Sequence, residues 1–152
     1  MPQTYLVIVT DAPEAKVALR FAALRAQKTD RGVEILAIGE RQDFAAWGGV
    51  QAAMEEEERL RVEAMIAASV HEIIEATGIK PTITVKQGEA IKVIAGEINE
   101  REDIAALVLG AAPGSNPGPI VKHFTGEGAG DLPCPVLLVP GGLTDERLEE
   151  LS

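Results

Sequence analysis

Residues 107–110 read LVLG and residues 133–140 read PCPVLLVP, with a segment rich in glycine, proline and serine between them. An apolar run that ends in glycine is typical of a buried parallel strand whose tip leads into a turn. The second run follows after too long a gap for a hairpin, which favours a parallel partner strand. Ligands of open α/β sheets bind at the carboxyl ends of such strands. This stretch therefore predicts a glycine-lined crevice for a small ligand.

Similar short apolar runs precede this stretch and alternate with helical patterns. We expect strands at residues 5–10, 33–38, 81–86, 104–109 and 136–139. Right-handed crossovers between them predict an α/β fold with one doubly wound five-stranded parallel sheet and helices on both faces. Strand 5–10 is apolar on both faces, so we expect it at the centre. Strand 81–86 alternates with polar residues and begins with proline, so we expect it at an edge.

Helix signals connect the strands. Asp11 is placed to cap the first helix, with Pro13 in its first turn and Gly32 as its stop. A long helix is closed by Gly78, and a further helix is expected over residues 90–100.

The chain of 152 residues is long enough for one domain with a full core, which we place at residues 1–140. Residues 141–152 are expected to form a short acidic tail, with one or two helical turns from Thr144.

Composition excludes several classes of partner. The net charge of -10 argues against nucleic acid, because binding to phosphate backbones needs clustered Lys and Arg. Cys134 is the single cysteine, so no internal disulfide forms, and a reducing cytoplasm is expected. No apolar run approaches the length of about 18 residues that a membrane span requires, and we expect no signal peptide before the first strand.

Four pieces of the sequence together resemble the universal stress protein family over about residues 4–140. They are Thr10-Asp11 after the first strand, Gln87-Gly88-Glu89-Ala90 before the third helix, Asp103 to Gly110, and Pro133-Cys134-Pro135-Val136. The resemblance implies a sheet ordered 3-2-1-4-5 and a homodimer. In one branch of the family it also implies bound ATP or AMP.

The nucleotide-binding branch carries a glycine motif after strand four: Gly, two residues, Gly, nine residues, then Gly followed by Ser or Thr. Gly110 matches the first position, but Pro113 stands at the second and Gly114 comes one residue late. Counting from Gly114 leads to Phe124-Thr125, with Gly126 next. The motif is therefore degenerate in this chain.

Phosphates in such a loop are held by successive backbone N–H groups and by a helix N-terminus. Three residues of the loop have no N–H to donate: Pro113, Pro117 and Pro119. The remaining candidate donors are Gly114, Ser115 and Asn116, with Thr125 or Gly126 closing from the start of the next helix. We expect ATP to bind weakly or not at all, while a smaller anion can still enter.

Other residues have two interpretations. The resemblance places Asp11 on the adenine side of a nucleotide site, with Ile38 at the end of strand two, although a helix cap at Asp11 needs no ligand. Lys122 and His123 either contact phosphate or are solvated surface residues. Trp47 either covers the crevice or packs on the helix that follows it.

No catalytic or metal site is apparent. The sequence has no phosphate-binding loop with a lysine and no nucleophile elbow, and its relatives' adenylate-transfer signatures are missing. We therefore expect a homodimeric stress-response module that is not an enzyme and binds adenine nucleotides weakly or not at all. The alternative is an ATP- or AMP-binding module that uses the loop after strand four.

The last strand predicts how the dimer forms. It lacks polar alternation yet lies at a sheet edge in the family, and an exposed apolar edge favours aggregation. Pairing with a second copy across a two-fold axis would cover it. The residues expected at this interface are Val136, Leu137, Leu138 and Val139.

Overall fold

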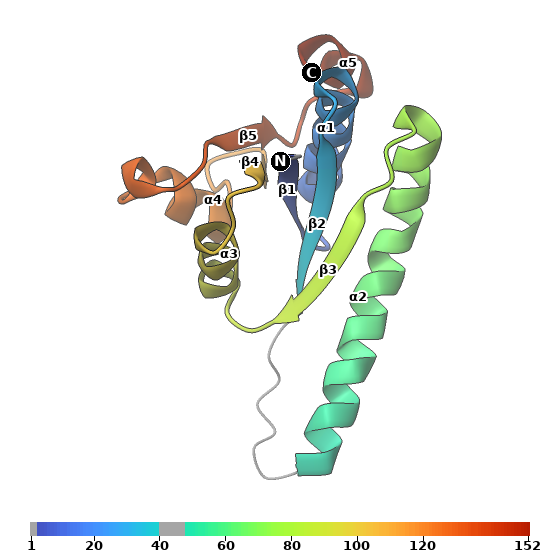
Figure 1. The fold of residues 1–152 in the computed structure, drawn as a ribbon, viewed down its shortest axis with the longest axis vertical. Helices are drawn as coiled ribbons and strands as arrows, with labels where there is room; N and C mark the ends of the chain where they lie inside the picture. Colours follow the sequence, from blue (N-terminus) through green and yellow to red (C-terminus); the bar gives the residue numbers. More distant parts are fainter. Residues whose placement is uncertain (1–2, 40–47) are drawn as a thin grey trace.

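Strands and helices alternate along the chain in the computed structural model, which describes residues 3–39 and 48–152 (Figure 1). The elements are β1 (Thr4–Val9), α1 (Pro13–Thr29), β2 (Gly32–Gly39), α2 (Gly48–Thr77), β3 (Thr82–Gln87), α3 (Ala90–Asn99), β4 (Ile104–Ala111), α4 (Pro119–Thr125), the 3-10 turn η1 (Ala129–Asp131), β5 (Val136–Pro140) and α5 (Asp145–Leu151). Every predicted strand is present, and the expected long helix ends at Thr77, one residue before Gly78.

The strands form one parallel sheet in the order β3-β2-β1-β4-β5, as expected. β1 lies at the centre, where Tyr5 pairs with Val33 of β2 and with Ala106 of β4. β3 lies at one edge, as its polar alternation predicted. β5 lies at the other edge. β1 and β4 are neighbours in the interior of the sheet, so their carboxyl ends lie side by side.

Two apolar layers cover the sheet, and β1 contributes to both. Its residues Tyr5, Val7 and Val9 pack toward α1 and α2. Its alternate residues Leu6 and Ile8 pack toward α3 and α4. Figure 1 shows these two pairs of helices on opposite faces of the sheet. A strand buried on both faces must be apolar throughout, which explains the continuous run in the sequence.

Both ends of α1 differ from the prediction. Because Pro13 takes the first helical position, the capping residue is Ala12 and not Asp11. Ala12 has no side-chain cap, and its N–H instead donates to Thr10 Oγ1 at 3.2 Å. At the other end, Asp30 takes the left-handed conformation (φ 54°) and ends the helix, a geometry that aspartate tolerates. Gly32 is therefore not the stop and begins β2.

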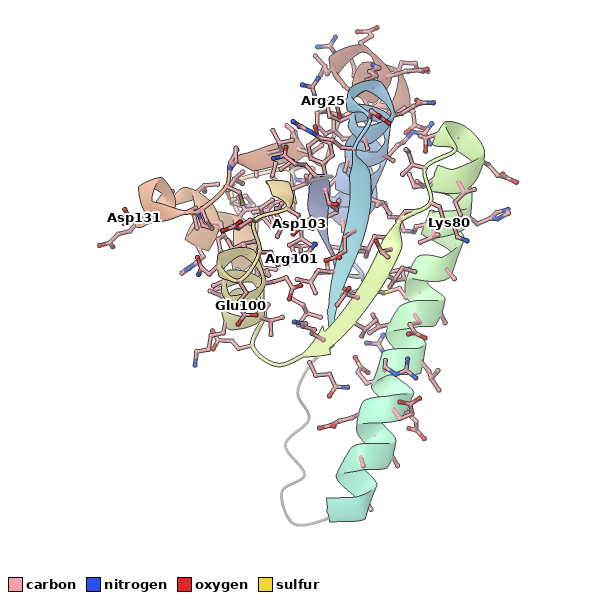
Figure 2. The ribbon with its side chains drawn as sticks, in the orientation of Figure 1. Arg25, Lys80, Glu100, Arg101, Asp103 and Asp131 are labelled. Carbon is pink, nitrogen blue, oxygen red and sulfur yellow. The ribbon has the colours of Figure 1, made fainter. Side chains whose placement is uncertain are left out.

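The acidic tail is part of the packed structure. Its helix α5 is capped by Thr144 as expected, and Leu148 is completely buried in the core shared with α1. Arg25 of α1, labelled in Figure 2, donates to the Ser152 carbonyl oxygen at 3.0 Å. Lys28 donates to a second carbonyl oxygen of the helix at 2.8 Å. The tail therefore packs against α1.

A group of charged side chains lies near the start of β4, where Figure 2 labels Arg101 and Asp103. Arg101 donates two hydrogen bonds to Asp103, at 2.9 and 2.8 Å. It also donates to Glu34 of β2 at 2.6 Å and to Glu97 of α3 at 3.2 Å. These hydrogen bonds raise the pKa of Arg101, and the bond from Arg101 lowers the pKa of Asp103. The guanidinium thereby links two strand ends and a helix.

Among residues 3–39 and 48–152, no helix combines the length and hydropathy needed to span a bilayer.

Candidate functional site

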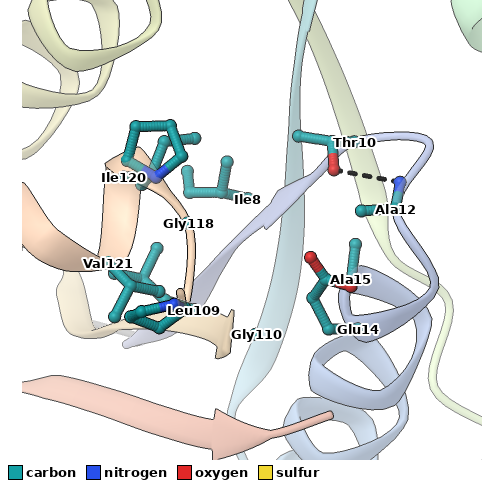
Figure 3. A pocket seen from close by; sticks show the side chains of 12 residues that line it. Ile8, Thr10, Ala12, Glu14, Ala15, Leu109, Gly110, Gly118, Ile120 and Val121 are labelled. Carbon is teal, nitrogen blue, oxygen red and sulfur yellow. Dashed lines mark hydrogen bonds between the residues drawn. The ribbon is translucent and has the colours of Figure 1, made fainter. Parts of the chain in front are cut away.

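A pocket of about 220 Å³ lies at the carboxyl ends of β1 and β4 (Figure 3). Its walls come from the end of β1, the first turn of α1, the end of β4 and the segment that leads into α4. Thr10 and Glu14 are the polar side chains that line it, and the rest are aliphatic residues, prolines and glycines. The crevice therefore lies where the sequence predicted it, and Gly110 is one of its walls.

Two glycines let α1 approach the sheet closely at this pocket. A Cβ on Gly110 would lie 2.3 Å from the carbonyl oxygen of Glu14. A Cβ on Gly141, just after β5, would lie 2.6 Å from Glu14 Cβ and 2.8 Å from the Ala111 carbonyl oxygen. Any side chain at either position would displace the first turn of α1. Gly110 thus has a packing role that requires no ligand, and Glu14 is held in place by its neighbours.

Glu14 and Thr10 are pocket residues that the sequence analysis did not select. The Glu14 side chain is half-buried, and no hydrogen bond or ion pair to its carboxylate occurs among the described residues. Thr10 Oγ1 accepts from the Ala12 N–H, so its own hydroxyl proton remains free to donate. In the sequence, Glu14 is marked only by its closeness to the end of the first strand, three residues after Asp11.

Asp11 and Ile38 meet in a second, adjoining pocket of about 190 Å³. Thr10 lines both pockets, and α2 supplies the opposite wall of the second one through residues that include Glu58 and Arg61. Arg61 donates to Glu58 at 2.6 and 3.0 Å, and this contact lowers the pKa of Glu58. Asp11 and Ile38, two of the candidate nucleotide-binding residues, therefore line the same pocket, and their contact with a nucleotide stays a prediction.

The loop after β4 forms hydrogen bonds within itself. Gly114, Ser115 and Asn116 are exposed and line neither pocket. The Asn116 side-chain oxygen accepts from the Gly118 N–H at 3.2 Å, and the Ala112 N–H donates to the Pro117 carbonyl oxygen at 3.3 Å. Ligand contact by these three exposed residues stays a prediction, and the N–H groups of Ala112 and Gly118 are already used within the loop.

The helix after this loop begins earlier than the glycine motif implied. α4 starts at Pro119 with Gly118 as its cap, so Thr125 and Gly126 lie at its carboxyl end. The expectation that they close the site from a helix start is wrong, because a proline at the first helical position fixes the beginning of the helix. Thr125 Oγ1 instead donates to the Val121 carbonyl oxygen at 2.7 Å.

The remaining candidates lie away from the pocket or have ordinary environments. Lys122 and His123 are exposed in the last turn of α4, and His71 is exposed on α2. Burial raises the pKa of the Cys134 thiol, which suits a small packed side chain more than a nucleophile. Trp47 lies outside the described residues. No cluster of side chains suited to a metal ion occurs in the part of the chain that the structure describes.

Comparison with known proteins gives a family and a fold. The sequence model of the universal stress protein family matches residues 1–140. A universal stress protein UspA from Lactobacillus plantarum is 16% identical with a TM-score of 0.73, over 90% of this chain and 97% of that one. One from Archaeoglobus fulgidus is 17% identical with a TM-score of 0.66, over 91% and 98%. An Arabidopsis thaliana family protein with AMP bound is 17% identical with a TM-score of 0.58, over 96% and 95%. No curated protein matches at the sequence level.

Proposed function

The chain belongs to the universal stress protein family, and from that premise we propose that it is a stress-response module that binds a small ligand and catalyses no reaction. The observation that carries this proposal is the pocket at the ends of β1 and β4. Among the described residues, no Lys, Arg or His lines it, and its prolines provide no N–H donors. It has the shape of a binding site, and it holds no Lys, Arg or His among the described residues to stabilise transferred charge.

We further propose that adenine nucleotides bind weakly or not at all. The AMP-bound relative from Arabidopsis thaliana shows that this fold admits an adenine nucleotide. In this chain the pocket around Asp11 and Ile38 is the counterpart for the adenine side. A phosphate chain reaching toward Gly110 would meet Glu14 and an apolar wall. Each missing charge-assisted hydrogen bond costs roughly 1.5–3 kcal/mol, so two losses weaken binding by about a hundredfold or more.

A second candidate function is favoured by one observation. The pocket that holds Asp11 and Ile38 also contains Arg61, which could approach a phosphate from α2. An ATP- or AMP-binding module that uses this pocket and the loop after β4 is the alternative.

The assembly that we propose is a homodimer through β5. This strand lies at the sheet edge, and its residue Leu138 is 46% exposed in the isolated chain. Val136 and Leu137 are half-buried beside it, whereas Val139 is 3% exposed and belongs to the protomer's own core. Pairing of two β5 edges would cover Leu138. A reducing cytoplasm suits the free thiol of Cys134.

Titration calorimetry with magnesium ATP and with AMP tests the nucleotide proposal. We expect a dissociation constant for ATP of about 100 μM or weaker, from the hundredfold loss applied to a micromolar site. A low-micromolar constant that Asp11→Ala abolishes would establish the alternative function. Glu127→Ala, a change at an exposed residue that lines neither pocket, is the matched control for removing one negative charge.

A further inference from the structure

Glu14 is the one charged residue that lines the pocket at the ends of β1 and β4, among the described residues. Figure 3 shows its carboxylate directed from the first turn of α1 toward the middle of the pocket. Facing it are aliphatic side chains from β1, β4 and α4, among them Ile8, Leu109 and Ile120. No described residue supplies a positive charge to this carboxylate. The pocket is therefore apolar with one unpaired anionic group at its side.

Packing fixes the backbone and Cβ from which the Glu14 side chain extends into the pocket. Gly110 and Gly141 leave room for only the backbone and Cβ of Glu14 against the ends of β4 and β5. The side chain lies in the first turn of the 17-residue helix α1, where the helix dipole favours negative charge. Beside it, Thr10 Oγ1 accepts one hydrogen bond from the Ala12 N–H and has a second lone pair free. The pocket thus offers two acceptors, one on Glu14 and one on Thr10.

We propose that this pocket binds a compact organic ammonium ion, with a primary amine on a small apolar body. The ammonium group would donate to the Glu14 carboxylate and to Thr10 Oγ1, and the apolar body would lie against the aliphatic wall. An anion would meet the like charge of Glu14, and a neutral apolar molecule would leave the carboxylate unpaired beside it.

The size of the pocket fits such a ligand. An apolar cavity of about 150 Å³ holds a benzene ring. The pocket here measures about 220 Å³, which leaves room for a ring and one methylene with its ammonium group. Benzylamine therefore serves as the probe, and benzyl alcohol is its neutral counterpart of the same shape. The inference rests on the proposed function in assuming that the crevice is a ligand site.

The test is a titration of the full chain with benzylamine at pH 7 and low salt, followed by amide chemical shifts in NMR. We expect saturable shifts at residues 8–15 and 109–121. Benzyl alcohol and the variant Glu14→Gln should each weaken binding on the order of tenfold, because each removes one charge-assisted hydrogen bond. Glu127→Gln removes the same charge at an exposed site and should leave the affinity unchanged.

Equal affinity of Glu14→Gln and the unaltered protein would overturn the proposal, as would shifts confined to other residues or the absence of saturation. If Glu14→Gln does not fold, the comparison of benzylamine with benzyl alcohol on the unaltered protein decides in the same way. A magnesium ATP titration of the same sample distinguishes failure of the proposed function from failure of the ammonium ligand. Low-micromolar ATP binding refutes the proposed function, whereas weak ATP binding without amine binding refutes the ammonium ligand alone.

Discussion

Replacing Gly110 with alanine is expected to force the first turn of α1 away from the end of β4. The new Cβ would lie 2.3 Å from the Glu14 carbonyl oxygen, 2.7 Å from the Glu14 carbonyl carbon and 3.3 Å from the Ala15 nitrogen. Real Cβ contacts below 3.0 Å essentially do not occur, and all three neighbours are backbone atoms. No side-chain rotation can relieve such a clash, so the helix itself has to shift.

Overpacking of this kind costs typically about 1–3 kcal/mol, and we expect the upper end for Gly110→Ala because a whole helix must move. For a chain of this size, about 3 kcal/mol lowers Tm by roughly 6–12 °C. Urea unfolding followed by circular dichroism measures the change, with the slope m checked for constancy.

Gly96→Ala provides the matched control for this substitution. Gly96 lies inside α3, and a Cβ there would meet nothing within 4 Å. Alanine at that position should therefore raise the free energy of unfolding by about 0.5–1 kcal/mol, through helix propensity alone. If the free energy of unfolding of Gly110→Ala instead lies within about 0.5 kcal/mol of that of the unaltered protein, the close approach of α1 to β4 is not rigid and the reasoning is refuted.

Three further measurements test other parts of the structure. Arg101→Ala should lower the free energy of unfolding by about 1–3 kcal/mol at pH 7. Because Arg101 depresses the pKa of Asp103, this difference should shrink as the pH falls from about 5 through the folded-state pKa; a pH-independent difference would contradict it. Leu148→Ala should cost about 2–5 kcal/mol in urea unfolding, whereas Leu151→Ala, 49% exposed on the same helix, should cost far less. Leu138→Glu should convert a dimer to a monomer in sedimentation with an unchanged circular dichroism spectrum, and a dimer that persists would place the interface elsewhere.

The positions of the strands in the sheet could be predicted from the sequence, because the pattern of apolar and polar residues shows which strands are buried on both faces. A continuous apolar run at residues 5–9 has no stable place except the centre of the sheet, and β1 is there. The edge position of β3 followed equally from polar alternation and Pro81. The packing of the C-terminal helix was harder to predict. A seven-residue helix with one buried leucine, Leu148, has too short a hydrophobic pattern to show whether the helix packs on the domain or is free in solvent.

The site was predictable in its location and less so in its residues. Gly110, Asp11 and Ile38 all line pockets, since the ends of parallel strands necessarily meet at one side of the sheet. Thr125 was expected at the start of a helix because its position was counted from the glycine motif. The helix α4 instead begins at Pro119, so Thr125 lies at its carboxyl end. Glu14 could not be found from spacing alone, because the direction of its side chain depends on how closely α1 packs on the strands.

The central position of β1 also shapes how the chain comes off the ribosome. β1 is synthesised first, yet one of its two edges stays unpaired until β4 appears, about a hundred residues later, where Tyr5 meets Ala106. In the meantime β2 and β3 can pair in turn, giving a half-sheet whose open edge is the most apolar strand of the protein. Pairing over such a sequence distance is intrinsically slow. A nascent chain arrested before β4 should therefore be an aggregation-prone species and a substrate for chaperones.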